Sequence, residues 1–136
     1  MIIDTSALVA VIREEPGYEP MLAAMLSGSG AIPAPVIVEL HRVMKIEGNQ
    51  INPTVIAYLK ELTDAGTLII SFTEDFAQRA AQANARFGSG NGRGGKLNML
   101  DLMVYGTAKS RDMPILFTGA DFPMTDARLH PASRLT

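Results

Sequence analysis

The chain opens with Met1-Ile2-Ile3-Asp4-Thr5-Ser6-Ala7-Leu8-Val9-Ala10-Val11-Ile12, in which nearly every neighbour of Asp4 is apolar. Ile2-Ile3 predicts a short buried strand, and the segment from Ala7 onward predicts a helix. An ionised carboxylate is costly to bury without a partner. In open α/β sheets, ligand sites form at the carboxyl ends of strands. Asp4 is therefore the first candidate for a functional site.

The composition is that of a globular chain with enough residues for one core. The 136 residues are 47% hydrophobic and 19% charged, so we expect one domain spanning 1–136. The chain has no cysteine, which excludes disulfides, thiolate zinc sites and a thiol nucleophile. It shows neither a signal peptide nor an apolar run of the ~18 residues that a membrane span needs, so we expect a cytoplasmic protein.

The net charge of −2 argues against nucleic-acid binding over the whole surface, but the charges are unevenly spread. Residues 1–85 carry five Lys and Arg against ten acids, whereas residues 86–136 carry seven against four. Such asymmetry places a basic surface beside an acidic pocket, unless it is a chance scatter of solvated charges.

Strands and helices are predicted to alternate along the chain. The predicted strands are 2–3, 31–33, 67–72 and 114–117. The predicted helices are 7–13, 18–27, 35–47, 53–65, 74–87 and 99–112, with Asn52, Thr73 and Asn98 as caps. The strands are apolar without polar alternation, which is typical of a parallel sheet covered on both faces. The predicted fold is a three-layer α/β/α sandwich with a short, mostly parallel central sheet.

Three more acids stand beside predicted core elements. Glu39 lies next to the apolar stripe of the third helix, although pairing with Arg42 would also explain its position. Asp101 is the third residue after the Asn98 cap, where a carboxylate also stabilises a helix N-terminus. Asp121 follows the last strand, where an ordinary turn aspartate is the alternative.

Together with Asp4, these acids offer only oxygen ligands. Carboxylates packed together repel and raise one another's pKa. A hard divalent cation such as Mg²⁺ or Mn²⁺ removes that conflict and prefers oxygen ligands. The four acids are too dispersed in the sequence to form a local motif, so their spacing alone leaves the metal site a hypothesis.

The same segments resemble a known family, the PIN domain, and within it the VapC-type toxin ribonucleases of type II toxin–antitoxin systems. The resemblance covers essentially the whole chain. It rests on Met1 to Leu8, on Glu39, on Leu97-Asn98-Met99-Leu100-Asp101 and on Leu116-Phe117-Thr118-Gly119-Ala120-Asp121-Phe122. Two segments depart from the family's pattern: Ala120 replaces a frequent second acid, and Arg93-Gly94-Gly95-Lys96 replaces a His-Pro-Ala element.

The resemblance implies a metal-dependent endoribonuclease that hydrolyses RNA phosphodiester bonds. The implied catalytic and metal-binding acids are Asp4, Glu39, Asp101 and Asp121, with Ser6 and Asn98 in support. Asp4 and Asp101 would be the firmest ligands of Mg²⁺ or Mn²⁺. The family also implies an RNA substrate, a homodimer and a small antitoxin. Apolar helix residues could supply the partner interface, unless they pack in the core: Leu8, Met21, Leu22, Met25 and Leu26.

The glycine-rich segment 88–95 contains a formal G-x-G-x-x-G at 90–95. It follows a predicted helix rather than a strand, so it lacks the context of a dinucleotide site. It is interpreted either as a flexible connector or as an edge that carries Arg93 and Lys96 to RNA phosphates.

Two other functions remain open from the sequence. A haloacid-dehalogenase-like phosphatase would use Asp4 as its nucleophile, but that family has a second Asp where this chain has Ser6. A catalytically weak PIN-like binding module is the other alternative, which Ala120 keeps open.

Overall fold

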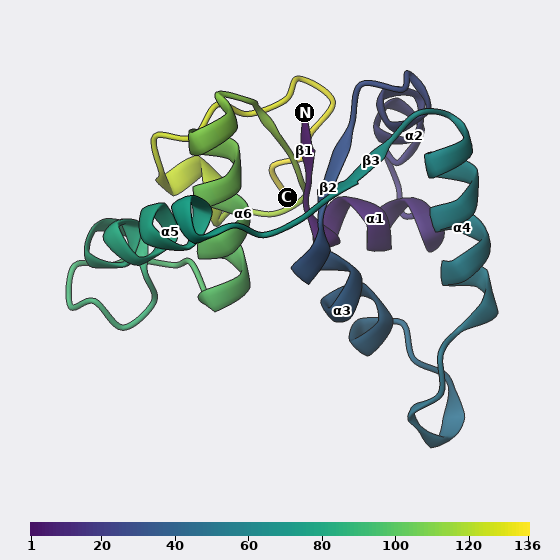
Figure 1. Ribbon diagram of the computed structural model, residues 1–136, viewed down its shortest axis with the longest axis horizontal. Helices are drawn as coiled ribbons and strands as arrows, with labels where there is room; N and C mark the ends of the chain where they lie inside the picture. The colour runs from purple at the N-terminus through teal and green to yellow at the C-terminus, as the bar shows by residue number, and fades with distance from the viewer.

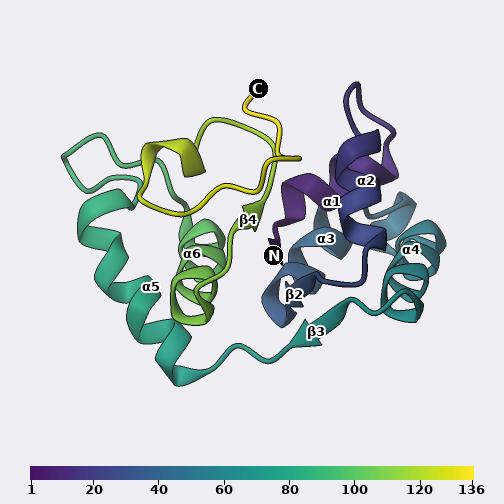
Figure 2. The same cartoon turned by 90° about the horizontal axis from the view of Figure 1, so that it is seen from above.

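The computed structural model covers residues 1–136 and contains one parallel four-stranded sheet in the order β3-β2-β1-β4. The strands are β1 (Ile2–Ile3), β2 (Ala31–Pro33), β3 (Leu68–Ile70) and β4 (Ile115–Leu116). The helices are α1 (Thr5–Ile12), α2 (Glu19–Leu26), α3 (Ala34–Val43), α4 (Pro53–Asp64), α5 (Glu74–Phe87) and α6 (Met99–Arg111). Helices α1 to α4 lie on one side of the sheet and α5 and α6 on the other (Figures 1 and 2). The predicted three-layer α/β/α sandwich is confirmed.

The strand order creates a reversal beside β1. The chain adds β2 and then β3 on one side of β1, and it later returns to place β4 on the other side. In open α/β sheets, ligands bind at the carboxyl ends of the strands where the order reverses. This edge of β1 and β4 is therefore the expected position of a site.

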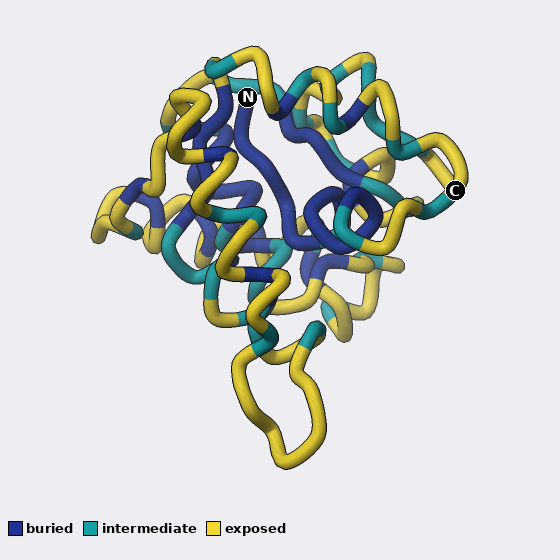
Figure 3. The backbone as a smooth tube through the Cα atoms, turned by 90° about the vertical axis from the view of Figure 1, so that its right-hand side faces the viewer, coloured by how far each residue is buried: buried dark blue, intermediate teal, exposed yellow.

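The hydrophobic core is built around β1 and the start of α1, which form a continuous buried path in Figure 3. Leu8, Met21 and Met25 are buried members of this core, so core packing accounts for three of the five candidate interface residues. Leu26 is 40% exposed and stays available for a partner. No helix is both long and apolar enough to span a bilayer.

Side-chain caps fix where the helices begin. Asn52, Thr73 and Asn98 accept hydrogen bonds from the first turns of α4, α5 and α6, as predicted. Helix α1 begins at Thr5, two residues earlier than predicted, because the Asp4 carboxylate accepts a hydrogen bond from the Ser6 backbone at 3.0 Å. Asp4 thus has a structural role that the sequence interpretation missed.

Helix α3 is shorter than predicted and ends at Val43 rather than at residue 47. The Asn52 side-chain amide donates to the Met44 carbonyl at 3.1 Å, and the Ile46 backbone bonds to Gln50. These contacts replace the next helical turn and lead into a short 3₁₀ helix, Glu47–Asn49, in an exposed loop (Figure 1).

Strand β3 is also shorter than the predicted 67–72, and it is not covered on both faces. Leu68 is 62% and Ile69 49% exposed, because β3 is the edge strand next to β2 only. At the opposite edge, the C-terminal tail runs along β4. Backbone hydrogen bonds join Ile115 to Arg128 and Phe117 to Arg134. Neither arrangement is visible in the local sequence pattern.

The close packing of α5 against α6 depends on Gly106. A Cβ atom at this position would lie 2.6 Å from the Phe76 carbonyl oxygen and 2.9 Å from the Ala80 nitrogen. Both are backbone atoms, so α5 and α6 would have to separate.

We predict that Gly106→Ala lowers the free energy of unfolding, measured by urea denaturation. The ~1 kcal/mol that alanine gains in helix propensity should be outweighed by overpacking, which typically costs ~1–3 kcal/mol. Arg111→Ala, at the exposed end of α6, is the control and should change little. A more stable Gly106→Ala protein would contradict the close approach.

Candidate active site at the ends of β1 and β4

Asp4 lies directly after β1 and is only 5% exposed. Its carboxylate oxygen Oδ2 accepts hydrogen bonds from the backbone nitrogen and from the hydroxyl of Ser6. Burial raises the pKa of Asp4 above its ordinary value, the Ser6 hydrogen bonds oppose that rise, and the charge of Glu39 adds to it. The fold therefore keeps a carboxyl group in an environment that disfavours its ionised form.

Ser6 connects the ends of the two central strands. Its hydroxyl donates to Asp4, and the same oxygen accepts a hydrogen bond from the Thr118 backbone at 3.0 Å. The Asp4 backbone in turn donates to the Leu116 carbonyl of β4 at 3.0 Å. The orientation of the Asp4 carboxylate is thus tied to the end of β4 as well as to α1.

Asp101 lies in the first turn of α6 and forms a capping box with Asn98. The Asn98 backbone donates to the Asp101 carboxylate at 3.0 Å, and the Asp101 backbone donates to the Asn98 side chain at 2.8 Å. The pKa of Asp101 rises to about 7: burial is the largest cause, the Asn98 hydrogen bond opposes it, and the charges of Asp4, Asp121 and Glu39 add to the rise. The cap explains the position of this acid but not its electrostatic cost.

Glu39 and Asp121 are the more accessible members of the group. Glu39 is half-buried on α3, which contacts α6, and Asp121 is exposed just before a 3₁₀ helix, Phe122–Met124. Neither the ion pair of Glu39 with Arg42, the alternative explanation of its position, nor any other ion pair to Lys or Arg involves the four acids. The charge of Glu39 raises the pKa of Asp4, and the charges of Glu39 and Asp121 raise that of Asp101, with no ion pair to offset them.

The donor chemistry of this region fits a hard divalent cation. The four acids supply only oxygen ligands, and their charges raise the pKa of Asp101 at the strand reversal. No three acidic or histidine side chains stand close enough together to hold a metal ion in the conformation described. The four acids are thus near enough for their charges to raise the pKa of Asp101, but they do not form a closed coordination shell.

The glycine-rich segment is a loop organised by one side chain. The Asn91 amide oxygen accepts hydrogen bonds from the backbones of Arg93 and Gly95, and its amide nitrogen donates to the Ala85 carbonyl. The base of the loop is closed by the Ser89 nitrogen, which donates to Leu97 at 2.7 Å. Arg93 is exposed on this loop, and its contact with RNA phosphates stays a prediction.

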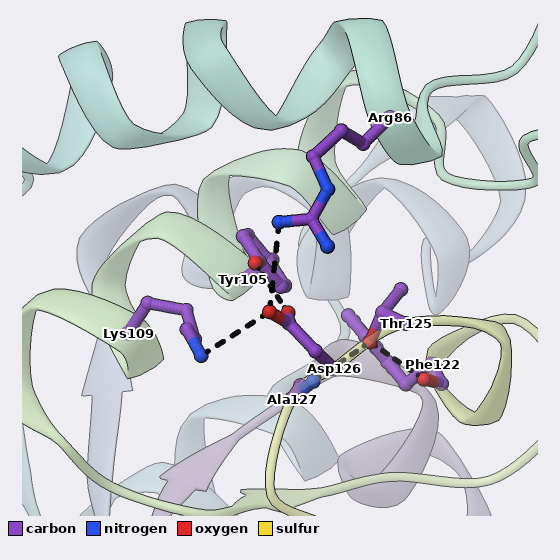
Figure 4. A network of polar contacts seen from close by, with 7 residues as sticks. All are labelled: Arg86, Tyr105, Lys109, Phe122, Thr125, Asp126 and Ala127. Carbon is purple, nitrogen blue, oxygen red and sulfur yellow. Dashed lines mark hydrogen bonds and ion pairs between the residues drawn. The ribbon is translucent and has the colours of Figure 1, made fainter.

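A polar network at the far end of α6 was not predicted from the sequence (Figure 4). The Tyr105 hydroxyl donates to the Asp126 carboxylate at 2.6 Å, and Arg86 and Lys109 each approach that carboxylate at 3.6 Å. The hydrogen bond from Tyr105 lowers the pKa of Asp126. The pKa of Tyr105 itself rises to about 12, through burial first and then through Asp126. The network joins three separate segments, so no local sequence pattern predicts it.

The raised pKa of Asp101 makes stability depend on pH. At a pH between its two pKa values, Asp101 is protonated in the folded chain, where its pKa is about 7, but ionised in the unfolded chain, where its pKa is near 3.8. We predict that the free energy of unfolding of the metal-free protein falls between about pH 5 and about pH 8. Asp101→Asn keeps an oxygen for the cap and should reduce this fall.

The measurement is urea denaturation with a chelator at both pH values. Asp75→Asn, in the exposed first turn of α5, is the matched control and should keep the wild-type fall. If the free energy of unfolding fell as much in Asp101→Asn as in the wild type, the raised pKa of Asp101 would be contradicted.

Comparisons with known proteins agree with this architecture. A family model described as PIN domain matches residues 1–127. Ribonuclease VapC36 of Mycobacterium tuberculosis is 35% identical over 128 residues, which cover 93% of this chain and 90% of the relative. Ribonuclease VapC42 of the same species is 35% identical over 129 residues, which cover 94% and 97%.

Solved structures show the same fold at low identity. The crystal structure of Mycobacterium tuberculosis VapC20, described as a sarcin-ricin loop cleaving toxin, matches with a TM-score of 0.70 and 12% identity, covering 93% of this chain and 95% of that one. DNA-bound VapBC from Salmonella typhimurium matches with a TM-score of 0.65 and 16% identity, covering 99% and 95%. From its family match and its curated relatives, this chain belongs to the PIN-domain family and, within it, to the VapC-type ribonucleases.

Proposed function

We propose that this chain is the endoribonuclease toxin of a toxin–antitoxin pair, acting with Mg²⁺ or Mn²⁺, and that residues 1–136 work as one PIN domain. The observation that carries the proposal is the repulsion that the other acids exert on Asp101 at the strand reversal, with none of the four paired with Lys or Arg. A protein that needed no cation there would be more stable with amides or apolar side chains.

Each residue of the proposed site has a distinct task. Asp4 and Asp101 would hold the ion, because hydrogen bonds already orient their carboxylates. Glu39 and Asp121 would complete the site, and one of these two would accept the proton of the attacking water. When bound, the ion would make that water a better nucleophile and stabilise charge on the phosphoryl oxygens.

Ser6 and Asn98 would be positioning residues. Ser6 fixes the Asp4 carboxylate and ties it to β4, and Asn98 fixes Asp101 at the start of α6. Glu39 and Asp121 lack such restraints, so their side chains are the ones free to turn toward a bound cation. The Ala120 side chain beside Asp121 offers no oxygen ligand, so the Asp121 side of the site would bind metal less tightly.

The proposed partners are an RNA substrate, a second copy of the chain and a small antitoxin. Support for the antitoxin comes from solved structures with this fold: VapBC of Salmonella typhimurium and VapBC2 of Rickettsia felis, each described as bound to DNA. Leu26 on α2 and the exposed edge strand β3 offer apolar surface for such partners.

We predict metal-dependent RNA cleavage that depends on the two firm ligands. Asp4→Asn and Asp101→Asn should each lower the cleavage rate by more than the ~10–100-fold typical of residues that only support a metal ligand. The measurement follows labelled RNA with Mg²⁺, with Mn²⁺ and with a chelator, and Asp75→Asn is the control.

Cleavage in the presence of chelator, or full activity in both variants, would overturn the proposal. RNA binding without cleavage would favour the catalytically silent module instead. Hydrolysis of small phosphate monoesters in place of RNA would favour the phosphatase alternative.

A second prediction concerns the metal itself. Mn²⁺ at about 100 times its dissociation constant should stabilise the folded chain by ~2.7 kcal/mol, because the ion binds the folded state only. The melting temperature should rise in the wild type and in Asp75→Asn. It should rise much less in Asp4→Asn. Equal rises in all three proteins would place the ion elsewhere.

A further inference from the structure

Two adjoining hollows share the side chain of Arg86. The near hollow, about 120 Å³, is lined by Asp121 of the candidate site together with Arg86, Arg93 and Lys96. The far hollow, about 360 Å³, is lined by Arg79, Arg86, Lys109, Tyr105 and Asp126. Because Arg86 borders both, the two hollows are neighbours, and their lining residues follow one another from Asp121 to α5 and α6.

These lining residues concentrate positive charge on a chain that is acidic overall. Five of the twelve Lys and Arg residues line the two hollows, against two acids, Asp121 and Asp126. We call these five residues the basic track: Lys96, Arg93, Arg86, Lys109 and Arg79. The remainder of the chain therefore carries a strong excess of negative charge.

Two cations of the track, Arg86 and Lys109, are held in place but remain accessible. The guanidinium of Arg86 stacks on the Phe87 ring at 4.6 Å, and its side chain is 62% exposed. Lys109 shares the Asp126 carboxylate with Arg86 and is 35% exposed (Figure 4). Asp126 cannot neutralise both, because it is one carboxylate that also accepts the Tyr105 hydroxyl. Net positive charge is left facing solvent.

We propose that the RNA strand leaving the proposed catalytic site lies along the basic track, with its phosphates on Arg93 and Lys96, then on Arg86, and finally on Lys109 and Arg79. This inference rests on the proposed ribonuclease function and extends it to the substrate's flanking nucleotides. The track would bind phosphates regardless of sequence, so it sets affinity and register rather than base choice.

RNA fits this surface better than an acidic protein segment does. Asp121 lines the near hollow, so a strand held in the proposed site enters that hollow directly. The lining of the far hollow is mostly polar or charged, and Ala83 and Tyr105 are its only apolar side chains. A protein partner would find few apolar anchors there, whereas phosphates need only the cations.

Asp126 then acts as a competitor for the same cations. It occupies Arg86 and Lys109 when no phosphate is present. Asp126→Asn retains an oxygen for the Tyr105 hydroxyl but removes the negative charge. This variant should bind long RNA more tightly by about twofold to fivefold, the range expected for exposed ion pairs.

The experiment measures RNA binding by fluorescence anisotropy in chelator, where metal-dependent cleavage is idle. Labelled RNAs of about 4 and about 16 nucleotides are titrated at several salt concentrations. The test variant is Arg79→Gln/Lys109→Gln, which leaves all four acids of the proposed site unchanged. The control is Lys60→Gln, an exposed cation on α4 at the opposite side of the molecule (Figure 1).

The double variant should bind the long RNA more weakly and lower the salt-dependence slope by about 1.4, since each lost phosphate contact removes ~0.7 on a single strand. Its affinity for the short RNA should match the wild type, because a short strand does not reach the far hollow. Lys60→Gln should change neither affinity nor slope. Circular dichroism confirms that each variant is folded.

Unchanged affinity and slope for the long RNA in the double variant would overturn the track. An equal loss of RNA affinity in Lys60→Gln would also overturn it, because overall charge would then explain the effect. Loss of binding to polyglutamate but not to RNA would assign the surface to an acidic protein. Absence of metal-dependent cleavage by the wild type would count against the proposed function alone, because this binding measurement requires no cleavage.

Discussion

The Asp4 carboxylate is buried at the junction of β1 and β4, where its hydrogen bonds to Ser6 offset only part of the cost of desolvation. The same oxygen that caps α1 is linked through the Ser6 hydroxyl to the backbone of Thr118. Start of helix, end of strand and candidate ligand are therefore one bonded unit. A change in any of the three would disturb the others. The hydrogen bonds within this unit allow a buried carboxylate at a position where an ordinary core would exclude one.

The remaining acids reach this unit from different elements. Asp101 arrives at the N-terminus of α6, Glu39 on α3 and Asp121 after β4, and their charges act on Asp101 together. None of the four acids forms an ion pair, although Lys and Arg pair with other acids elsewhere. Ion pairs would have lowered the electrostatic cost of these carboxylates. Their absence leaves a negative centre that a divalent cation can fill.

Local chemistry explains which features were predictable. The caps at Asn52, Thr73 and Asn98 depend on residues a few positions apart, so the sequence located those helix starts correctly. The parallel sheet followed from the apolar runs. The four acids were found because each stands out against apolar neighbours, although their assembly into one site still rests on the family resemblance and on their electrostatic coupling.

The features that were missed depend on contacts between distant segments. The exposure of Leu68 follows from the edge position of β3, and the early end of α3 follows from the side chain of Asn52, eight residues beyond Met44. The tail lies along β4 through backbone hydrogen bonds, which leave no side-chain pattern. In each case the local sequence does not show which distant segment contacts these residues and so sets their exposure or where their helix ends.

The charge distribution along the sequence also fails to show which cations share a surface. Dividing the sequence at residue 85 separates an acidic part from a basic part, yet Arg79 comes from the acidic part and lines the far hollow. The relevant division is between faces, because α5 and α6 pack side by side and bring Arg79, Arg86 and Lys109 together. A negative centre with an adjoining positive path suits a polyanionic strand that must be held by its phosphates while one of them reaches a metal ion. Neither half of that arrangement alone would serve: without a cation the acids would repel RNA, and the proposed track alone would bind RNA without cutting it.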